Sequence, residues 1–379
     1  MREDGKMVVG KHRNTKVIVD LGAIKENVAQ EKRQLEADQK LFAVVKANAY
    51  GHGLVEVAQA ASQAGADGFC VAVIDEGVAL RQAGFEQEPI LILGVNPASE
   101  ATYMASYNLS VAVSSLDFLQ AAQPELLKAK LKLRVHLALD TGMGRIGFKD
   151  VATLKEAVAY LNANPQAFVF EGIFTHFAQA DSKDTSYYHQ QLAKFKELTG
   201  SLEQLPPYVH VANSAAALWH HDCGGNVIRY GISMYGLNPS GRELELPRPL
   251  KPALSLVSEL VHVKQVAKGE SIGYGSTYTA SEDEWIGTVP LGYADGWLRR
   301  MQGFAVLIAG QYCPIVGRVC MDQFMVKLPA NLALGTKVTL IGKDGSEEIT
   351  AQDVADYAHT IHYEITCCLG ERLPRIYRE

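Results

Sequence analysis

Short apolar runs alternate with amphipathic segments from residue 41 to about residue 236, and this alternation restricts the fold more than any other feature of the sequence. An apolar run without polar alternation is typical of a strand that is buried on both faces of a sheet, as parallel strands are. The intervening segments have helical periodicity and are long enough for crossover helices; examples are 53–64, 75–83, 150–161 and 186–202. Eight runs are expected to be strands: 41–45, 69–73, 90–93, 109–113, 133–139, 170–174, 208–211 and 227–230.

Eight strand–helix units predict a (β/α)8, TIM-like barrel. A doubly wound open sheet would give the same alternation, because a count of strands does not show that a sheet closes. Both folds belong to the α/β class, and both place functional residues at the carboxyl ends of their strands.

The pattern changes near residue 240. After a proline-containing linker at 248–252, runs of strand type follow one another without helices between them. These runs are 254–266, 285–290, 305–308, 315–319, 324–328 and 337–341, with one helix candidate at 351–359. The sequence therefore predicts a barrel domain over residues 1–240 and a mainly antiparallel β domain over residues 241–379. Packing of residues 1–16 on the β domain is a second option for that segment, and a strand at 17–20 is compatible with either domain.

Charge and composition exclude several classes of function. The chain has 379 residues, a formal net charge of −6 and no long run of lysine and arginine, so neither a nucleic acid nor a membrane surface is an expected partner. The first residues carry charges of both signs and no apolar segment, which indicates a cytoplasmic protein. The six cysteines form no Cys-x-x-Cys pair, so neither a metal site nor a disulfide framework is expected.

A lysine, Lys46, ends the first predicted strand. In a closed barrel the first and eighth strands are neighbours, so Arg229, in the eighth, would face Lys46. The loops after strands seven and eight commonly bind phosphate in such barrels, and Ser214 opens a helix in the first of these loops. A phosphate beside a strand-end lysine suggests pyridoxal phosphate, which binds lysine as a Schiff base. A solvated lysine and an ordinary helix cap at Ser214 are the competing interpretations.

Seven short motifs in chain order resemble those of the bacterial alanine racemases. They are VVKANAYGHG (44–53), DTGMGR (140–145), THF (175–177), NS (213–214), RYG (229–231), YGSTY (274–278) and CMD (320–322). The resemblance implies a barrel that binds pyridoxal 5'-phosphate, a C-terminal β domain, and a head-to-tail homodimer with shared active sites. It also implies an isomerase that interconverts L-alanine and D-alanine and so supplies D-alanine for peptidoglycan in the cell wall.

The two bases of that family map onto Lys46 and Tyr274. By the resemblance, Lys46 holds the cofactor as an aldimine, and Tyr274 of the partner subunit is the second base. One group removes the α-proton from one face of the substrate, and the other returns a proton to the opposite face. Arg229 is expected to face the pyridine nitrogen, where a permanently charged guanidinium cannot readily supply a proton.

The resemblance assigns further roles residue by residue. His176 would connect the tyrosine to the arginine, and His210 would support Arg229 from behind. Contacts to the cofactor phosphate map to Tyr50, Ser214, Gly231, Ile232 and Tyr363. The substrate carboxylate maps to Arg145 and the backbone of Met321. The entrance to the site maps to Tyr293, Ile361, Asp181, Arg299 and Arg318.

One position departs from many relatives, which have a lysine seven residues before the arginine of the DTGMGR motif. In those relatives the lysine is carbamylated, and its negative charge holds the arginine in place. This chain has Ala138 there, so no carbamate can form. We hypothesise that a chloride ion or an ordered water molecule lies beside Arg145 instead.

Two other functions remain open at this point. A related racemase that acts on serine or on a broader set of amino acids would have no sequence feature that separates it from an alanine racemase. A non-catalytic carrier of pyridoxal phosphate could use the same barrel, but such proteins generally lack the β domain, so residues 254–379 and Tyr274 count against it.

Overall fold

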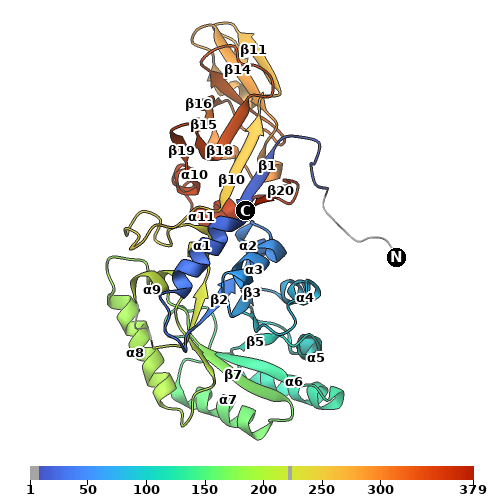
Figure 1. The fold of residues 1–379 in the computed structure, drawn as a ribbon, viewed down its shortest axis with the longest axis vertical. Coiled ribbons are helices and arrows are strands. Elements are labelled where there is room, and N and C mark those ends of the chain that lie inside the picture. The colour runs from blue at the N-terminus through green and yellow to red at the C-terminus, as the bar shows by residue number, and fades with distance from the viewer. Residues whose placement is uncertain (1–7, 221–223) are drawn as a thin grey trace. The chain divides into compact units, whose positions relative to one another are not determined.

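The computed structural model describes residues 8–220 and 224–379, so Cys223 and the first seven residues of the 1–16 segment lie outside the described residues. The chain forms two compact units (Figure 1). The barrel unit consists of Gly22–Ala49 and Leu54–Pro252. The β unit consists of the described residues up to Leu21, the segment Tyr50–Gly53, and Ala253–Glu379. The chain therefore passes to the β unit after Pro252, whereas the sequence placed the boundary after residue 240.

The barrel unit contains eight parallel strands in the order β8-β7-β6-β5-β4-β3-β2-β9. The last strand lies beside the first, with Phe42 opposite Arg229. The two ends of the sheet are joined by hydrogen bonds from Asn226 N to Val209 O (2.8 Å) and from Arg229 N to Ala212 O (3.0 Å). The barrel is therefore nearly closed, which confirms the predicted (β/α)8 fold and makes the open sheet wrong. The strands are β2 (Lys40–Val44), β3 (Gly68–Val71), β4 (Ile90–Ile92), β5 (Ser110–Val113), β6 (Leu133–Ala138), β7 (Phe168–Phe174), β8 (Tyr208–His210) and β9 (Val227–Tyr230).

Helices connect these strands, and some of them begin at a polar side chain that caps the first turn. Asp150 accepts a hydrogen bond from Thr153 N (2.9 Å), and Asn213 accepts one from Ala216 N (2.9 Å). Each side chain thus provides an acceptor for a backbone N–H that has no partner within the first turn of its helix. The helices are α1 (Leu21–Lys32), α3 (Leu54–Gln63), α4 (Ile74–Gln82), α5 (Ala101–Ser106), α6 (Leu116–Ala129), α7 (Val151–Ala163), α8 (Ser186–Gly200) and α9 (Ser214–Trp219), with 3₁₀ turns η1 (Ala98–Glu100) and η2 (Ile232–Tyr235).

The β unit is built on a ten-stranded sheet, as the predicted β domain requires. Its path is β11-β14-β17-β16-β15-β18-β10-β1-β20, with β19 paired to β18, and each pairing is antiparallel except that of β1 with β20. The strands are β1 (Lys16–Asp20), β10 (Leu254–Glu259), β11 (His262–Val266), β14 (Glu284–Val289), β15 (Ala305–Ile308), β16 (Gln311–Val316), β17 (Phe324–Leu328), β18 (Lys337–Asp344), β19 (Glu347–Ile349) and β20 (Arg375–Arg378).

Strand β1 belongs to this sheet rather than to the barrel. Val17 lies opposite Leu256 of β10 on one side and beside Arg375 of β20 on the other. Two short helices follow the last antiparallel strands, α10 (Ala351–Tyr357) and α11 (His362–Cys367). Three 3₁₀ turns complete the unit: η3 (Tyr274–Ser276), η4 (Tyr293–Asp295) and η5 (Arg299–Met301).

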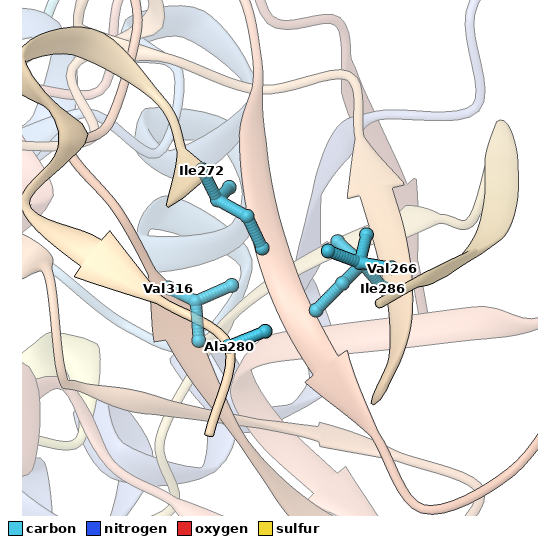
Figure 2. Packing of buried hydrophobic residues seen from close by; sticks show 5 residues of the cluster. All are labelled: Val266, Ile272, Ala280, Ile286 and Val316. Atoms are coloured by element: carbon cyan, nitrogen blue, oxygen red, sulfur yellow. The ribbon is translucent and has the colours of Figure 1, made fainter. Parts of the chain in front are cut away.

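A small hydrophobic cluster anchors the hairpin of β12 (Ser271–Ile272) and β13 (Tyr278–Thr279) to the large sheet. Figure 2 shows its five buried side chains: Val266, Ile272, Ala280, Ile286 and Val316. Tyr278 and Met325 pack against them. Ile272 precedes the turn that carries Tyr274, and Ala280 follows the second strand of the hairpin. Their burial therefore fixes both sides of the hairpin to the sheet.

No helix in residues 8–220 or 224–379 combines the length and the apolar character that crossing a bilayer requires.

Candidate functional site

Lys46 directly follows strand β2, and the chain turns left-handed immediately after it. Ala47, Asn48 and Ala49 have φ values of 54°, 52° and 53°, and Tyr50 has φ 52°. Such backbone costs roughly 1–2 kcal/mol per residue for an L-amino acid, so surrounding groups must hold it. Ala47 N donates to Glu76 Oε1 (2.6 Å), Leu54 N donates to Asn48 Oδ1 (2.9 Å), and Ala49 N donates to Val45 O (2.8 Å).

Three cations gather at the carboxyl ends of the barrel strands. Burial holds the pKa of His176 well below its ordinary value, and the charges of Arg229, Arg145 and Lys46 lower it further. Cys70, at the same end, has a pKa raised by burial to about 12, against the opposing effect of Arg229 and Lys46. Both groups respond to Lys46 and Arg229 together, so these two side chains share one local field, as the strand order predicts.

The guanidinium of Arg229 is buried and held from several sides. Its Nη1 donates to His210 Nδ1 (2.9 Å) and His210 O (3.0 Å). Its Nη2 donates to Thr175 O (2.8 Å) and contacts His176 Nδ1 (3.1 Å). These contacts place the three sequence-predicted residues His176, His210 and Arg229 in one hydrogen-bonded group at the barrel mouth.

The group continues into the barrel through a second histidine and a carboxylate. His210 Nε2 lies 2.8 Å from His136 Nδ1, and His136 Nε2 lies 3.1 Å from Glu171 Oε2. Because arginine cannot accept a hydrogen bond, His210 must accept from Arg229 and donate to His136, which then donates to Glu171. We call Arg229, His210, His136 and Glu171 the barrel relay. Its hydrogen bonds assign one tautomer to each of its two histidines.

Sequence reasoning missed Glu171. It lies in strand β7, FVFEGIF, where a carboxylate among apolar residues was the available signal. Ser110 Oγ and Arg134 Nη1 also donate to it, the latter at 2.9 Å. Burial acts to raise the pKa of Glu171, but the bonds from His136 and Ser110 and the charge of Arg134 outweigh burial, and the net pKa is lowered.

The loops after strands β8 and β9 meet at Ser214. Its buried Oγ accepts hydrogen bonds from Gly231 N (2.8 Å) and Ser233 N (3.4 Å). With both lone pairs engaged, the hydroxyl hydrogen remains to donate to a ligand. Ile232 begins the 3₁₀ turn η2 directly after Gly231, so three of the predicted phosphate residues lie together.

Ala138 lies in an apolar setting. It forms a buried cluster with Ala112 and Phe174, against which Leu93 and Ile146 pack. Arg145 itself is exposed, in the loop after β6 whose backbone is tied by Gly142 N and Gly144 N donating to Asp140 Oδ1 (3.1 and 2.9 Å).

The β unit brings together two further predicted phosphate residues. The rings of Tyr50 and Tyr363 lie 6.1 Å apart between centroids. Gly51 packs so closely on α11 that an added Cβ would lie 2.1 Å from Thr366 O. Arg375 Nε donates to Gly51 O (3.1 Å), which ties the segment after the lysine turn to the end of the chain.

Tyr274 is the first residue of η3 and is 68% exposed. Gly273 and Gly275 on either side of it both have φ 74°, a left-handed conformation that favours glycine. An added Cβ at Gly275 would lie 3.0 Å from Nη1 of Arg318, so this predicted entrance residue packs on the tyrosine turn.

The other predicted residues lie in loops of either unit. Met321, Tyr293 and Ile361 are exposed in the β unit, as is Arg299 in η5. Asp181 is half-buried in the barrel unit, and burial raises the pKa of its carboxyl. The structure therefore divides the predicted site: Lys46, Arg145, His176, Asp181, His210, Ser214, Arg229, Gly231 and Ile232 lie in the barrel unit, and Tyr50, Tyr274, Tyr293, Arg299, Arg318, Met321, Ile361 and Tyr363 lie in the β unit.

Known proteins resemble the chain over nearly its whole length. Residues 19–239 match the family described as alanine racemase, N-terminal domain, and residues 253–377 match alanine racemase, C-terminal domain. A curated alanine racemase from Ligilactobacillus salivarius is 63% identical over 98% of this chain and 100% of its own length.

Two solved structures extend the comparison. The crystal structure of alanine racemase from E. faecalis has a TM-score of 0.96 and 55% identity, and covers 98% of this chain and 100% of that one. A histidine racemase from Leuconostoc mesenteroides has a TM-score of 0.93 at 35% identity, again over 98% and 100%. The matched domains, the relatives and the shared architecture agree with the site geometry: the chain belongs to the alanine racemase family.

Proposed function

We propose that this enzyme interconverts L- and D-alanine with pyridoxal 5'-phosphate bound to Lys46. The observation that carries the proposal is that Lys46 directly follows β2, the strand paired with the Arg229 strand β9, and that the charges of Lys46 and Arg229 both act on the buried Cys70. The alanine racemases among its relatives supply the substrate.

The residues present fit this cofactor. Ser214 can donate its hydroxyl hydrogen, and the buried Ser233 Oγ of the same loop has no hydrogen-bond partner among the described residues. A buried polar group without a partner is costly, and an anion held in this loop would relieve that cost. Gly231, Ile232, Tyr50 and Tyr363 are the further phosphate contacts of the proposal. When bound, pyridoxal phosphate draws electrons from the substrate's α-carbon and so makes its proton acidic.

Lys46 and Tyr274 would move that proton. In one direction the Lys46 amine removes it from one face of the α-carbon, and the Tyr274 hydroxyl donates a proton to the opposite face. In the other direction the phenolate accepts the proton and the ammonium of Lys46 donates one. Since the two groups act from opposite faces, each passage inverts the configuration.

Arg229 would set the electronic character of the site. Fixed by His210, Thr175 and His176, its guanidinium can face the ring nitrogen of the cofactor but has no readily transferable proton. Less negative charge from the substrate would then be drawn onto the cofactor ring. This favours return of the proton to the substrate's α-carbon over side reactions. His210 acts only through Arg229, whereas His176 also serves to orient Tyr274.

Arg145 and the N–H of Met321 would bind the substrate carboxylate. An apolar cluster surrounds Ala138, so a chloride ion that compensates Arg145 would lie on the guanidinium side and not in the space of the missing lysine. Crystals grown in bromide should give an anomalous peak beside Arg145. Refined density that holds neither an anion nor an ordered water there would contradict this part of the proposal.

Two copies of the chain would share their sites in the cytoplasm. Tyr274, Tyr293, Met321 and Ile361 are large apolar side chains that the β unit leaves exposed, and Asp181, Arg299 and Arg318 would complete an entrance with them. Exposed apolar residues of this kind mark association surfaces. A homodimer in which each Tyr274 serves the partner subunit's lysine accounts for that exposure.

The test is racemisation of L-alanine, L-serine and L-histidine by the purified protein with added cofactor. We expect alanine to be preferred, and we expect Tyr274→Phe to lower turnover by about 10²–10⁴-fold. That variant should keep the visible absorption of the lysine-bound cofactor, whereas Lys46→Ala should lose both. Absence of turnover on all three amino acids would reject the proposal, and a preference for serine or histidine would reassign the substrate.

A further inference from the structure

A carboxylate with no exposed surface, Asp295, lies between two arginines from opposite ends of the chain. Arg13 makes a two-pronged contact: Nη1 donates to Oδ2 (3.0 Å) and Nη2 donates to Oδ1. Arg372 Nε donates to Oδ1 (2.7 Å). A fourth donor, Gly292 N, reaches Oδ2 (3.1 Å). We call Arg13, Asp295 and Arg372 the Asp295 cluster.

The cluster closes the turn that carries Tyr293. Gly292 N donates to the Asp295 carboxylate, as described above, and Gly292 O accepts a hydrogen bond from Asp295 N (3.0 Å). Tyr293 lies inside this loop, and the carbonyl of Asp295 accepts from Gly370 N (2.9 Å) on the far side. Three hydrogen bonds thus fix a turn whose tyrosine is 42% exposed.

The same turn is packed against the segment that carries Met321. Tyr293 N donates to Cys320 O (3.1 Å), and Ala294 N donates to Met321 O (3.0 Å). A Cβ on Gly292 would lie 2.2 Å from Met321 O, so the two backbones touch. Arg372 Nη1 also donates to Asp322 Oδ1 (2.8 Å), a second link from the cluster to this segment.

The donors around Asp295 favour the ionised form of its carboxyl group. Burial acts to raise the pKa of Asp295, but the bonds from Arg372, Arg13 and Gly292 N outweigh it and lower the pKa. Removing one arginine therefore leaves an ionised carboxylate with one guanidinium, and the turn loses part of its support.

We infer that Arg13 and Arg372, acting through Asp295, are positioning residues for substrate binding: they hold the Met321 backbone and the Tyr293 ring at the places where the substrate carboxylate is received. The inference rests on the roles proposed above for Met321 and Tyr293. It assigns a function to Arg13, which precedes both domains' first strands and belongs to no motif of the sequence.

The test is Arg13→Ala in the full-length protein. We expect KM for alanine to rise about tenfold with kcat changed by less than about twofold, because the lost bonds orient a binding group and not a base. In the protein without cofactor, amide hydrogen exchange at 292–297 and 320–322 should accelerate about tenfold. Arg13→Lys keeps the charge but not the fork, and should give intermediate values.

The matched control is Asn14→Ala, whose exposed side chain bonds to Glu259 Oε2 (2.8 Å) and not to the cluster. It should leave KM and exchange unchanged. If Arg13→Ala does not fold, Asp322→Ala, at an exposed position, removes only the acceptor of the Arg372 link and should raise KM by itself. Unchanged KM and exchange in an active Arg13→Ala enzyme would overturn the inference. An inactive wild-type protein would instead reject the proposed function, while the exchange data still test the cluster.

Discussion

The barrel relay shows how one buried carboxylate can set the hydrogen positions of a distant arginine's partners. Glu171 accepts from His136, His136 from His210, and His210 from Arg229, so reversing any one bond would require the others to reverse. With His210 and His136 fully buried, no bulk water competes for their nitrogens. The tautomer that presents an acceptor to Arg229 is thereby favoured from within the protein.

Glu171→Gln should destabilise the protein by about 2 kcal/mol at pH 7, because it removes the charge that accepts buried hydrogen bonds from His136 and Ser110 and a partly exposed one from Arg134. The pKa of Glu171 is lowered on folding, so its stabilisation is present above the unfolded pKa, near 4.3, and is lost as pH falls through the folded pKa. The difference in unfolding free energy between Glu171→Gln and wild type should therefore become smaller at acid pH. Urea unfolding from pH 7 down to about pH 2.5, below the unfolded pKa, measures this.

The control for that experiment is Glu156→Gln, an exposed carboxylate on α7 of the same unit. It should change stability little at either pH. If the difference in unfolding free energy between Glu171→Gln and wild type stays constant with pH, the packing of the side chain, and not its charge, accounts for the lost stability.

Sequence could predict that the strand before Lys46 and the strand of Arg229 are neighbours, but not the relay. Strand order alone brings the carboxyl ends of the first and eighth strands together, and the structure confirms that adjacency. His136 and Glu171 lie deeper in their strands, and whether an inward side chain contacts another depends on the stagger of the barrel. The register shift between Val135 and His136 on β6 is one such detail that a sequence pattern does not contain.

At the scale of an element, the left-handed turn after β2 is the part of the structure least expected from sequence. The sequence placed Lys46 and Tyr50 on one loop or first helical turn. Four successive residues without glycine adopt φ near +52° instead. Propensity opposes this, so it is the tertiary contacts of Glu76 and Asn48 that impose it.

Ala47→Gly should stabilise the protein by about 0.5–1 kcal/mol, since glycine adopts positive φ without steric cost. Ala47 is exposed, so no packing is lost. The matched control is Ala121→Gly, an exposed alanine within α6, where the same substitution should cost about 1 kcal/mol. Thermal unfolding of both variants decides the matter, and a loss of stability at both positions would contradict the strain argument.

At the scale of the whole molecule, the two units carry complementary halves of the proposed site. The predicted β domain is confirmed, but the run 254–266 forms two strands, β10 and β11, and the run 315–319 overlaps only the end of β16. The two-residue strands β12 and β13 were not predicted, because strands this short have no periodicity. The membership of β1 also depends on pairing with β10, far along the chain, which no local pattern reveals.

Co-expression of Lys46→Ala with Tyr274→Phe tests whether subunits share their sites. If Tyr274 serves the partner subunit's lysine, each mixed dimer has one intact site and one doubly altered site. Random pairing makes half the dimers mixed, so activity should return to about a quarter of wild type. Activity that stays at the level of the separate variants would place both bases in one chain's site, or exclude mixed dimers, which differently tagged subunits can detect.

The pairing of β1 with both β10 and β20 has a consequence for biosynthesis. The strand made first at the ribosome lies between neighbours made late and last, with Ile18 beside Ile376 near the end of the chain. At roughly 5–20 residues per second, synthesis of the remaining chain takes on the order of half a minute. Throughout that time the barrel sequence can emerge and fold, while β1 waits until its sheet neighbours β10 and β20 have been made.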